Sequence, residues 1–375
     1  MIQDQTVQKL MKLCEPRTFK GQEYICFEGQ PGNEMYIILR GSVGVYVNSA
    51  VDTLTEVSRI MTGDFFGEMS IFDNLPRSAS CIALEDTVCV AINKDRLTDF
   101  LTTCPEMAVK LLENMSGRIR RLDNELYKTE KFVRNAKVKE FEIPEGYSFS
   151  HKVEEPYHDL KYVEQLATYC PVCGKDITVN NIKKQIMSIR RIDPDGRIRY
   201  AEYDTLWNDV WYCPYCHYSN HYLSFFRMMP FKRETIKKLL KEQHVPVIEN
   251  AKHLDTMFDQ LFLRYIQAIH INEAVNMNDS LLIGRLWLNL YWLLTDANDE
   301  AMSKYCAEKA APLLAKAYED NTITDEYSKQ IISLTIASLY ALCGSKDEAK
   351  KFCELAVGGE DSELRGHAMR LRERI

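Results

Sequence analysis

Residues 66–80 read FGEMSIFDNLPRSAS, and this stretch decides the fold of the first third of the chain. Gly67 and Ser70 permit a tight entry into a short helix, whose unpaired backbone N–H groups attract an anion. Glu68 can then accept a hydrogen bond from a sugar hydroxyl, and Arg77 offers a forked donor to phosphate oxygens. The spacing therefore suits a cyclic sugar phosphate.

The segments on either side of this stretch predict short antiparallel strands. Residues 25–47 read ICFEGQPGNEMYIILRGSVGVYV, in which β-branched runs are separated by glycines that mark turns. Two further runs, 55–60 and 80–92, bracket the stretch at 66–80. We expect a small antiparallel β-barrel of jelly-roll type that holds the loop between its strands. The alternative is a plain β-roll whose surface arginine and glutamate bind no ligand.

The stretch resembles the phosphate-binding cassette of the cyclic-nucleotide-binding family. The residues that fall on the family's positions are Gly67, Glu68, Pro76, Arg77, Ser78 and Ala79. The order Arg-Ser-Ala resembles the bacterial catabolite activator branch more than the kinase regulatory subunits. The resemblance implies a receptor for a cyclic nucleotide, with cAMP as the first choice. The ligand-binding residues that it implies are Gly67, Glu68, Met69, Ser70, Arg77, Ser78, Ala79, Asp123 and Asn124.

The length and composition of the chain limit the classes of protein to which it can belong. Its 375 residues exceed the usual size of one hydrophobic core and predict two or three domains. The net charge of −7 argues against a generally basic surface for nucleic acid. The start, MIQDQTVQKLMKLC, lacks the apolar core of a signal peptide, and the longest apolar run, 281–294, is too short and too polar for a membrane span. We expect a cytoplasmic protein.

A long helix is predicted after the barrel, over residues 105–142. Apolar or small residues recur there at alternating steps of three and four, which is a heptad seam. The seam consists of Leu112, Met115, Ile119, Leu122, Leu126, Thr129, Val133 and Ala136. Such a seam pairs with the same helix of a second chain in a homodimer, or it packs on the chain's own barrel or C-terminal helices. In the catabolite activator family the corresponding helix dimerises and contacts the purine, which is the role implied for Asp123 and Asn124.

Two matching cysteine pairs, YCPVCGK and YCPYCHY, predict a metal site. Its ligands are Cys170, Cys173, Cys213 and Cys216. Two residues between the cysteines of a pair let both sulfurs face one ion, and four thiolates make a closed tetrahedral zinc site with no open catalytic position. A redox dithiol is the alternative, although it does not need a second pair. The remaining cysteines are scattered among apolar neighbours, which favours a reducing compartment over a disulfide framework.

The segment between and around the cysteine pairs predicts a small rigid module. Residues 186–203 indicate a β-hairpin with its turn at 193–196, Asp-Pro-Asp-Gly. His217 and His221 could replace a zinc ligand or hold a water, or they are ordinary, partly exposed side chains. Aromatic residues gather near the second pair, either to stack on bases or to pack a module with little core. They are Tyr203, Trp207, Trp211, Tyr212, Tyr215, Tyr218 and Tyr222.

Helical periodicity continues from about residue 234 to the end. Residues 286–310 and 334–356 echo each other: each has Leu-Tyr, a polar loop, Asp-Glu-Ala and an aromatic-Cys pair. The second copy resembles a tetratricopeptide repeat, on Ala337, Tyr340, Gly344, Ala349 and Ala356. The first copy departs at the loop, where Asp296 and its neighbours replace the glycine. Such helix pairs bind a protein partner or form a structural bundle.

The part of the chain from about residue 164 to the end also resembles an uncharacterised bacterial cysteine-rich family. The resemblance rests on the two CPxC knuckles, the Asp-rich hairpin and the helical tail. It implies no activity.

The sequence thus predicts a multidomain α+β protein. Its segments are a cyclic-nucleotide-binding β-barrel over 1–104, a connecting dimerisation helix over 105–142, a zinc module over 143–233 and a tetratricopeptide-like helical domain over 234–375. We expect a cyclic-nucleotide sensor that regulates the attached module and a protein partner. The alternative is a nucleotide-controlled regulator that binds nucleic acid through the zinc module. Catalysis is not expected, because no nucleophile with an adjacent base stands outside the cassette and the metal site is coordinatively full.

Overall fold

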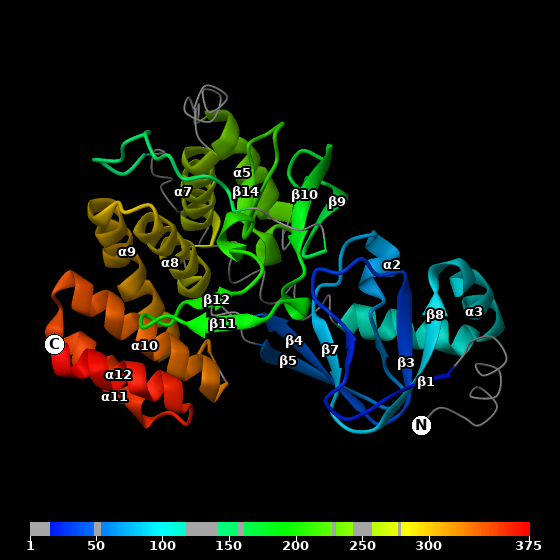
Figure 1. Cartoon of the computed structure of the whole chain (residues 1–375). Helices are drawn as coiled ribbons and strands as arrows, with labels where there is room; N and C mark the ends of the chain where they lie inside the picture. The colour runs from blue at the N-terminus through cyan, green and yellow to red at the C-terminus, as the bar shows by residue number, and fades with distance from the viewer. Residues whose placement is uncertain are drawn as a thin grey trace. The chain divides into compact units, whose positions relative to one another are not determined.

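The computed structural model describes residues 16–48, 54–117, 142–156, 161–226, 230–242, 257–276, 279–323 and 325–375 (Figure 1). The chain folds as two compact units, of which the first holds the described residues up to 117 and the second those from 142 onward. Among the described helices, none is long and apolar enough to cross a membrane.

Two four-stranded antiparallel sheets form the first unit. In one sheet the order is β1 (Pro16–Phe19), β8 (Thr87–Asn93), β3 (Glu34–Arg40) and β6 (Phe65–Phe66). In the other it is β2 (Tyr24–Cys26), β7 (Ser80–Ala83), β4 (Ser42–Asn48) and β5 (Leu54–Met61). The helical elements between and after the strands are α2 (Met69–Asp73), η1 (Lys94–Arg96) and α3 (Leu97–Thr103). The predicted antiparallel, jelly-roll-like fold is confirmed.

The apolar run in β3 supplies both hydrophobic clusters of this unit. Met35 and Ile37 pack in one cluster, and Tyr36 and Ile38 pack in the other. Successive side chains of a strand point to opposite faces, so a continuous apolar run is what a strand buried on both faces requires. β6 is the edge strand next to β3, and its Phe65 and Phe66 are both 2% exposed, so the cassette starts from a buried strand.

The chain is helical over residues 105–117. Met107, Leu111 and Met115 pack into the barrel cluster, whereas Leu112 is 64% exposed. This part of the helix therefore turns one face to its own barrel. The seam positions from 119 onward, together with Asp123 and Asn124, lie outside the described residues. The homodimer stays a prediction.

Three two-stranded antiparallel hairpins begin the second unit. They are β9 (Val163–Tyr169) with β10 (Asp176–Ile182), β11 (Ile189–Ile192) with β12 (Ile198–Tyr200), and β13 (Val210–Tyr212) with β14 (Ser219–His221). Each hairpin is followed by a short 3₁₀ turn: η2 (Lys184–Ile186), η3 (Thr205–Trp207) and η4 (Tyr222–Ser224). The predicted hairpin at 186–203 is confirmed as β11 and β12, with a hydrogen bond from Gly196 N to Asp193 O of 2.9 Å across its turn.

Helices make up the rest of the second unit. They are α5 (Pro230–Glu242), α7 (Met257–Val275), α8 (Ser280–Asp296), α9 (Glu300–Glu319), α10 (Glu326–Cys343), α11 (Lys346–Gly358) and α12 (Ser362–Arg374). From α7 to α12, each helix packs against the next along the chain (Figure 1). Aspartates accept a backbone N–H at the starts of α8, α9, α10 and α12, as N-caps do.

The echo between the two helix pairs has a structural basis at the helix ends. α10 ends at Gly344 with φ of 83°, and α8 is followed by Asn298 with φ of 58°. Asn321, after α9, has φ of 53°. Asparagine tolerates the left-handed conformation better than most non-glycine residues. Asn298 can therefore take the position in the first copy that Gly344 has in the second. The likeness to tetratricopeptide repeats stays a prediction.

The cysteine-rich hairpins and the helices share their hydrophobic clusters. Val172 and Trp211 pack with Ile236 of α5 and Ile271 of α7. A second, larger cluster joins Trp207 and its neighbours to α7–α12. The predicted segment boundary at 233 thus falls inside one compact unit, because a small metal module with little core of its own gains burial from the helices.

Residues 142–156, which we call the docking segment, lie on α7 and on the start of α9. The Tyr147 ring stacks on that of Phe262, with centroids 3.6 Å apart, and its hydroxyl donates to Asp259 Oδ1 at 2.5 Å. His151 lies between two carboxylates, 3.1 Å from Asp259 Oδ1 and 3.0 Å from Asp299 Oδ2. Buried hydrogen bonds to charged groups are among the stronger ones, so the segment is firmly held.

The β11–β12 turn provides a test of how tightly the hairpin packs on the helices. Gly196 has φ of 84°, and a Cβ there would overlap Thr335 Oγ1 and lie 3.2 Å from Ile331 O. We expect Gly196→Ala to lower the free energy of unfolding by about 2–4 kcal/mol, because backbone strain adds to overpacking. Urea denaturation of the full chain measures this loss.

Gly344→Ala is the matched control for that variant. Gly344 has nearly the same φ, 83°, but a Cβ there would meet nothing within 4 Å. Only the backbone strain applies, so the expected loss is about 1 kcal/mol. Equal losses in the two variants would contradict the packing of the turn on α10.

Candidate functional site

Two glycines leave room for one arginine in the first unit. Gly67 has φ of 75°, and a Cβ on it would overlap Arg77 Nη1. A Cβ on Gly32 would lie 2.5 Å from both Arg77 Nε and Ser70 Oγ. Any other residue at either position would push the guanidinium out of its place. The glycines in the cassette and in the β2–β3 loop are therefore required by the side chain of Arg77 as well as by the turns.

Arg77 is only 7% exposed, and hydrogen bonds hold both its side chain and its backbone. Its Nη1 donates to Gly67 O at 2.7 Å and to Ser70 Oγ at 3.0 Å. Its backbone is paired in both directions, since Arg77 N donates to Gln30 O and Gly29 N donates to Arg77 O. Nε and Nη2 take no hydrogen-bond partner from the described residues. These donors are oriented before any ligand arrives.

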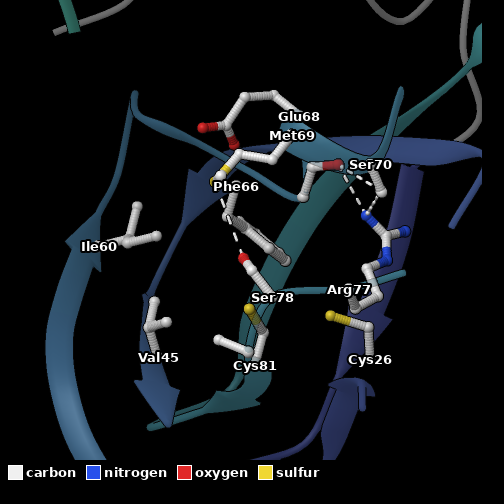
Figure 2. Close-up of a pocket in the computed structure, with 12 residues that line it drawn as sticks. Cys26, Val45, Ile60, Phe66, Glu68, Met69, Ser70, Arg77, Ser78 and Cys81 are labelled. Carbon is white, nitrogen blue, oxygen red and sulfur yellow. Dashed lines mark hydrogen bonds between the residues drawn. The ribbon is translucent and has the colours of Figure 1, made fainter. Parts of the chain in front are cut away.

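A pocket opens beside this guanidinium (Figure 2). Its lining residues are Cys26, Val45, Ile60, Phe66, Gly67, Glu68, Met69, Ser70, Arg77, Ser78, Ala79 and Cys81. Ser70 lies beside Arg77, and Val45 and Ile60 line the opposite side (Figure 2). An apolar wall with a few convergent polar groups is typical of a small-molecule site.

The polar groups of the pocket match the parts of a sugar phosphate. Arg77 supplies a planar cation for phosphate oxygens, and Ser78 supplies an exposed hydroxyl next to it. Glu68 is 4% exposed and lines the same pocket, so its carboxylate can accept from a sugar hydroxyl. Burial strengthens both interactions, because the effective dielectric constant is lower there than in water.

The structure brings together seven of the nine residues that the sequence predicts for this site. Gly67, Glu68, Met69, Ser70, Arg77, Ser78 and Ala79 all line the one pocket. Asp123 and Asn124 lie outside the described residues. Sequence reasoning missed Gly32 and the pocket floor, which consists of Cys26, Val45, Ile60, Phe66 and Cys81. Strand alternation could have indicated which face these floor residues share, but not that the face borders a ligand.

The four predicted metal ligands meet in the second unit. Their sulfur atoms all lie within 4.8 Å of one another, with 3.6 Å between Cys170 and Cys216 and 3.7 Å between Cys173 and Cys213. A tetrahedron of sulfurs about 2.3 Å from zinc has edges of about 3.8 Å, so the cluster fits a zinc ion. A bound ion would link the β9–β10 and β13–β14 hairpins, and its four thiolate ligands would leave no coordination position open for a substrate.

The two knuckles have the same backbone structure. In the first knuckle, Cys170 N donates to Lys175 O and Gly174 N donates to Cys170 O. In the second, Cys213 N donates to Tyr218 O and His217 N donates to Cys213 O. Gly174 and His217 both have positive φ, 76° and 62°. His217 thus occupies the turn position that glycine has in the first knuckle, and its ring is paired with the Tyr212 hydroxyl.

His221 and most of the aromatic residues near the second knuckle have packing roles. His221 is 1% exposed, and its ring accepts from Leu223 N at 3.3 Å. Trp211 is 4% exposed and Tyr218 is fully buried. Tyr215 is 55% exposed and lies near Lys175. A buried ring cannot stack on a base, so the packing interpretation fits Trp211 and Tyr218.

Fold and pocket together define the first unit as a domain of the cyclic nucleotide-binding class, and the family of that description matches residues 16–104. A second family, described as "Uncharacterized protein conserved in bacteria (DUF2225)", matches residues 164–373. This match covers more than half of the chain, and the protein belongs to that family. The resemblances that the sequence indicates at both ends are confirmed.

Several known proteins are similar to the first third of the chain. A CRP-like cAMP-activated global transcriptional regulator of Mycobacterium tuberculosis is 32% identical over 126 residues, which are 33% of this chain and 56% of that protein. The chain thus spans about half the length of this curated relative. Among solved structures, the catabolite activator protein of Thermus thermophilus is 26% identical, with 33% of this chain and 59% of that chain covered and a TM-score of 0.31. A cyclic nucleotide-binding domain from Methylobacillus flagellatus is 28% identical, with 34% and 75% covered and a TM-score of 0.29.

The four-cysteine cluster predicts the metal content of the protein. We expect one zinc ion per chain, and we expect Cys173→Ser to lose the ion and to lower the melting temperature, because the knuckles pack with α5 and α7. Elemental analysis and thermal unfolding of the two proteins measure both effects. Cys343→Ser is the control, since this half-buried thiol lies outside the cluster. Full zinc content in Cys173→Ser would contradict the assignment of the ligands.

Proposed function

We propose that the protein is a cyclic-nucleotide receptor whose N-terminal domain controls the attached cysteine-rich and helical unit. The observation that carries the proposal is the preorganised Arg77: it is buried, its Nη1 and its backbone are held by hydrogen bonds, and it lines one pocket together with Glu68 and Ser78. A buried cation of this kind is costly without an anion. A phosphate in the pocket supplies one.

The pocket supports a definite orientation for the ligand. The phosphate binds at Arg77 and Ser78, and the ribose 2′-hydroxyl donates to Glu68. The cyclic sugar packs on the apolar floor near Val45 and Phe66. A cyclic nucleotide carries both the phosphate and the 2′-hydroxyl that this orientation requires.

We infer that the ligand is cAMP. The support is the order Arg-Ser-Ala in the cassette and the similarity to a regulator whose name states that cAMP activates it. The contacts described so far are to the sugar phosphate, and the residues implied for the base, Asp123 and Asn124, are not described. A comparison of cAMP, cGMP and cyclic dinucleotides by calorimetry tests the choice.

Arg77 provides the sharpest test of binding. We expect Arg77→Ala to weaken cAMP binding at least about tenfold, because a charge-assisted hydrogen bond is worth about 1.5–3 kcal/mol. Isothermal titration calorimetry on the full chain measures the affinity. Arg59→Ala is the matched control, since Arg59 is on β5 of the same domain, pairs with Glu56 at the surface and does not line the pocket. Equal affinities in the wild type and Arg77→Ala would sink the proposal.

The docking segment offers a route from the receptor to the second unit. It follows the helix that begins at residue 105, and it is anchored on α7 and α9 by Tyr147 and His151. Both ring nitrogens of His151 lie within hydrogen-bond distance of carboxylate oxygens, one on α7 and one at the start of α9. A change in the helix on ligand binding therefore acts on a fixed point of the second unit, as a population shift between two arrangements.

Hydrogen exchange tests this route. We expect the exchange of backbone amides in 142–156 to differ between the free and the cAMP-saturated protein, because the ligand biases the helix to which this segment is joined. Mass spectrometry of peptides from the full chain measures the difference. The same experiment on Arg77→Ala, at the same cAMP concentration, is the control in which no difference is expected. Unchanged exchange in the wild type at saturation would mean that the signal does not pass through this segment.

The output that we propose is contact with a protein partner through the helical unit, without catalysis. The support is the run of helix pairs from α8 to α12, which leaves Tyr327, Leu342 and Leu355 exposed. Nucleic acid is the alternative partner, and a gel shift at several salt concentrations separates the two, since phosphate contacts weaken steeply as salt rises. Burial of Trp211 and Tyr218 leaves less aromatic surface for that alternative.

A further inference from the structure

Two cysteines lie next to each other in the floor of the ligand pocket. Cys26 is on β2 and Cys81 is on β7, and the two residues are direct partners in the antiparallel pairing. Both line the pocket, with exposed fractions of 6% and 5%. Their sulfur atoms face each other below Arg77 (Figure 2). The metal site and the phosphate-binding residues make no use of this pair.

The geometry of the strand pair suits a bond between the two sulfurs. Directly opposite residues of antiparallel strands have Cα atoms about 4.5–5.5 Å apart, which falls within the range of about 4.4–6.8 Å found in disulfides. The register shifts between Tyr24 and Cys26, and such an irregularity lets one strand adjust locally. The two cysteines can therefore be joined without breaking the sheet.

The surroundings also favour chemistry at Cys26. A hydrogen bond from Cys81 lowers the pKa of Cys26, burial opposes this shift, and the positive charge of Arg77 adds to it. The thiolate is the reactive form of cysteine. By contrast, burial raises the pKa of Cys89, on β8 of the same domain, to about 12. Cys89 also lies outside the pocket lining.

We propose that Cys26 and Cys81 form a reversible disulfide in the floor of the pocket, and that this disulfide weakens nucleotide binding. A peroxide that enters the pocket is the oxidant. The Cys26 thiolate attacks one peroxide oxygen, the O–O bond breaks, and a sulfenic acid and one water result. The Cys81 sulfur then attacks the Cys26 sulfur and releases the second water. Two thiols and one hydrogen peroxide thus give one disulfide and two waters.

The bond would alter the site through Arg77. A disulfide holds its sulfurs about 2.0 Å apart, closer than any hydrogen-bonded pair of thiols, so the two side chains turn toward each other and the backbone of β2 shifts locally at its irregularity. The residues just after β2, Gly29 and Gln30, hold the backbone of Arg77, which itself comes three residues before β7. Moving these residues misaligns the guanidinium, and the expected loss of affinity is about tenfold, the size of one charge-assisted hydrogen bond. This half of the inference rests on the proposed function.

Mass spectrometry of the full chain tests the bond itself. The zinc-loaded, ligand-free protein is treated with hydrogen peroxide, its free thiols are alkylated, and it is digested with trypsin without reduction. We expect a peptide of 21–40 joined to one of 78–94, which thiol reductant separates. Because 78–94 contains both Cys81 and Cys89, the experiment is repeated on Cys89→Ala, where the joined peptide must persist. Both cysteines remaining alkylated after peroxide would overturn the proposal.

Calorimetry with cAMP tests the regulatory half. We expect about tenfold weaker binding after oxidation, recovery after reduction, and no effect of peroxide in Cys26→Ser. If the disulfide forms and the affinity is unchanged, the regulatory half is wrong. If the reduced wild type binds no cyclic nucleotide, the proposed function fails, while the disulfide is still judged by the peptide masses alone.

Discussion

The N-terminal domain is organised around a guanidinium that is almost completely removed from water. A buried cation is unfavourable unless it is hydrogen-bonded and meets an anion, and Arg77 obtains its fixed bonds from Gly67 O and Ser70 Oγ. Those bonds require the absence of a Cβ at Gly67 and Gly32, and they require β6 and β7 to bring the two ends of the cassette together. The two glycines and the polar side of the pocket are thus tied to the position of one charge.

The second unit depends on a different constraint, which is the small size of its cysteine-rich hairpins. Each hairpin is only two strands, and such a pair has little stability in water by itself. Four cysteine sulfurs within 4.8 Å of one another bring two of the hairpins together, and α5 and α7 cover Val172 and Trp211. The salt bridges from Arg197 and Arg199 to Asp296 tie the middle hairpin to the end of α8. The shared core and the ion pairs together make one unit of two apparent modules.

Much of the architecture could be predicted because the deciding signals are local. The Asp-Pro-Asp-Gly turn, the cysteine knuckles and the cassette each depend on residues close in sequence, and all three form the expected structures. Other features could not be predicted because they depend on residues far apart in sequence. The hydrogen bonds of His151 to Asp259 and Asp299 join residues that are more than 100 positions apart, and no sequence motif relates them. The end of α8 was also hard to predict, because Asn298 takes the left-handed conformation for which the repeat pattern has a glycine.

The amino-acid sequence by itself determined the class of each part: a β-fold with a cyclic-nucleotide cassette, a four-cysteine site and a helical C-terminal region. Periodicity, turn residues and ligand spacing are properties of short segments, and they survive without knowledge of the fold. Only the tertiary structure decided that Cys26 and Cys81 face each other under Arg77, and that the metal module shares a core with the helices. Those facts depend on strand register and packing, which bring distant residues into contact and are set by the whole core at once.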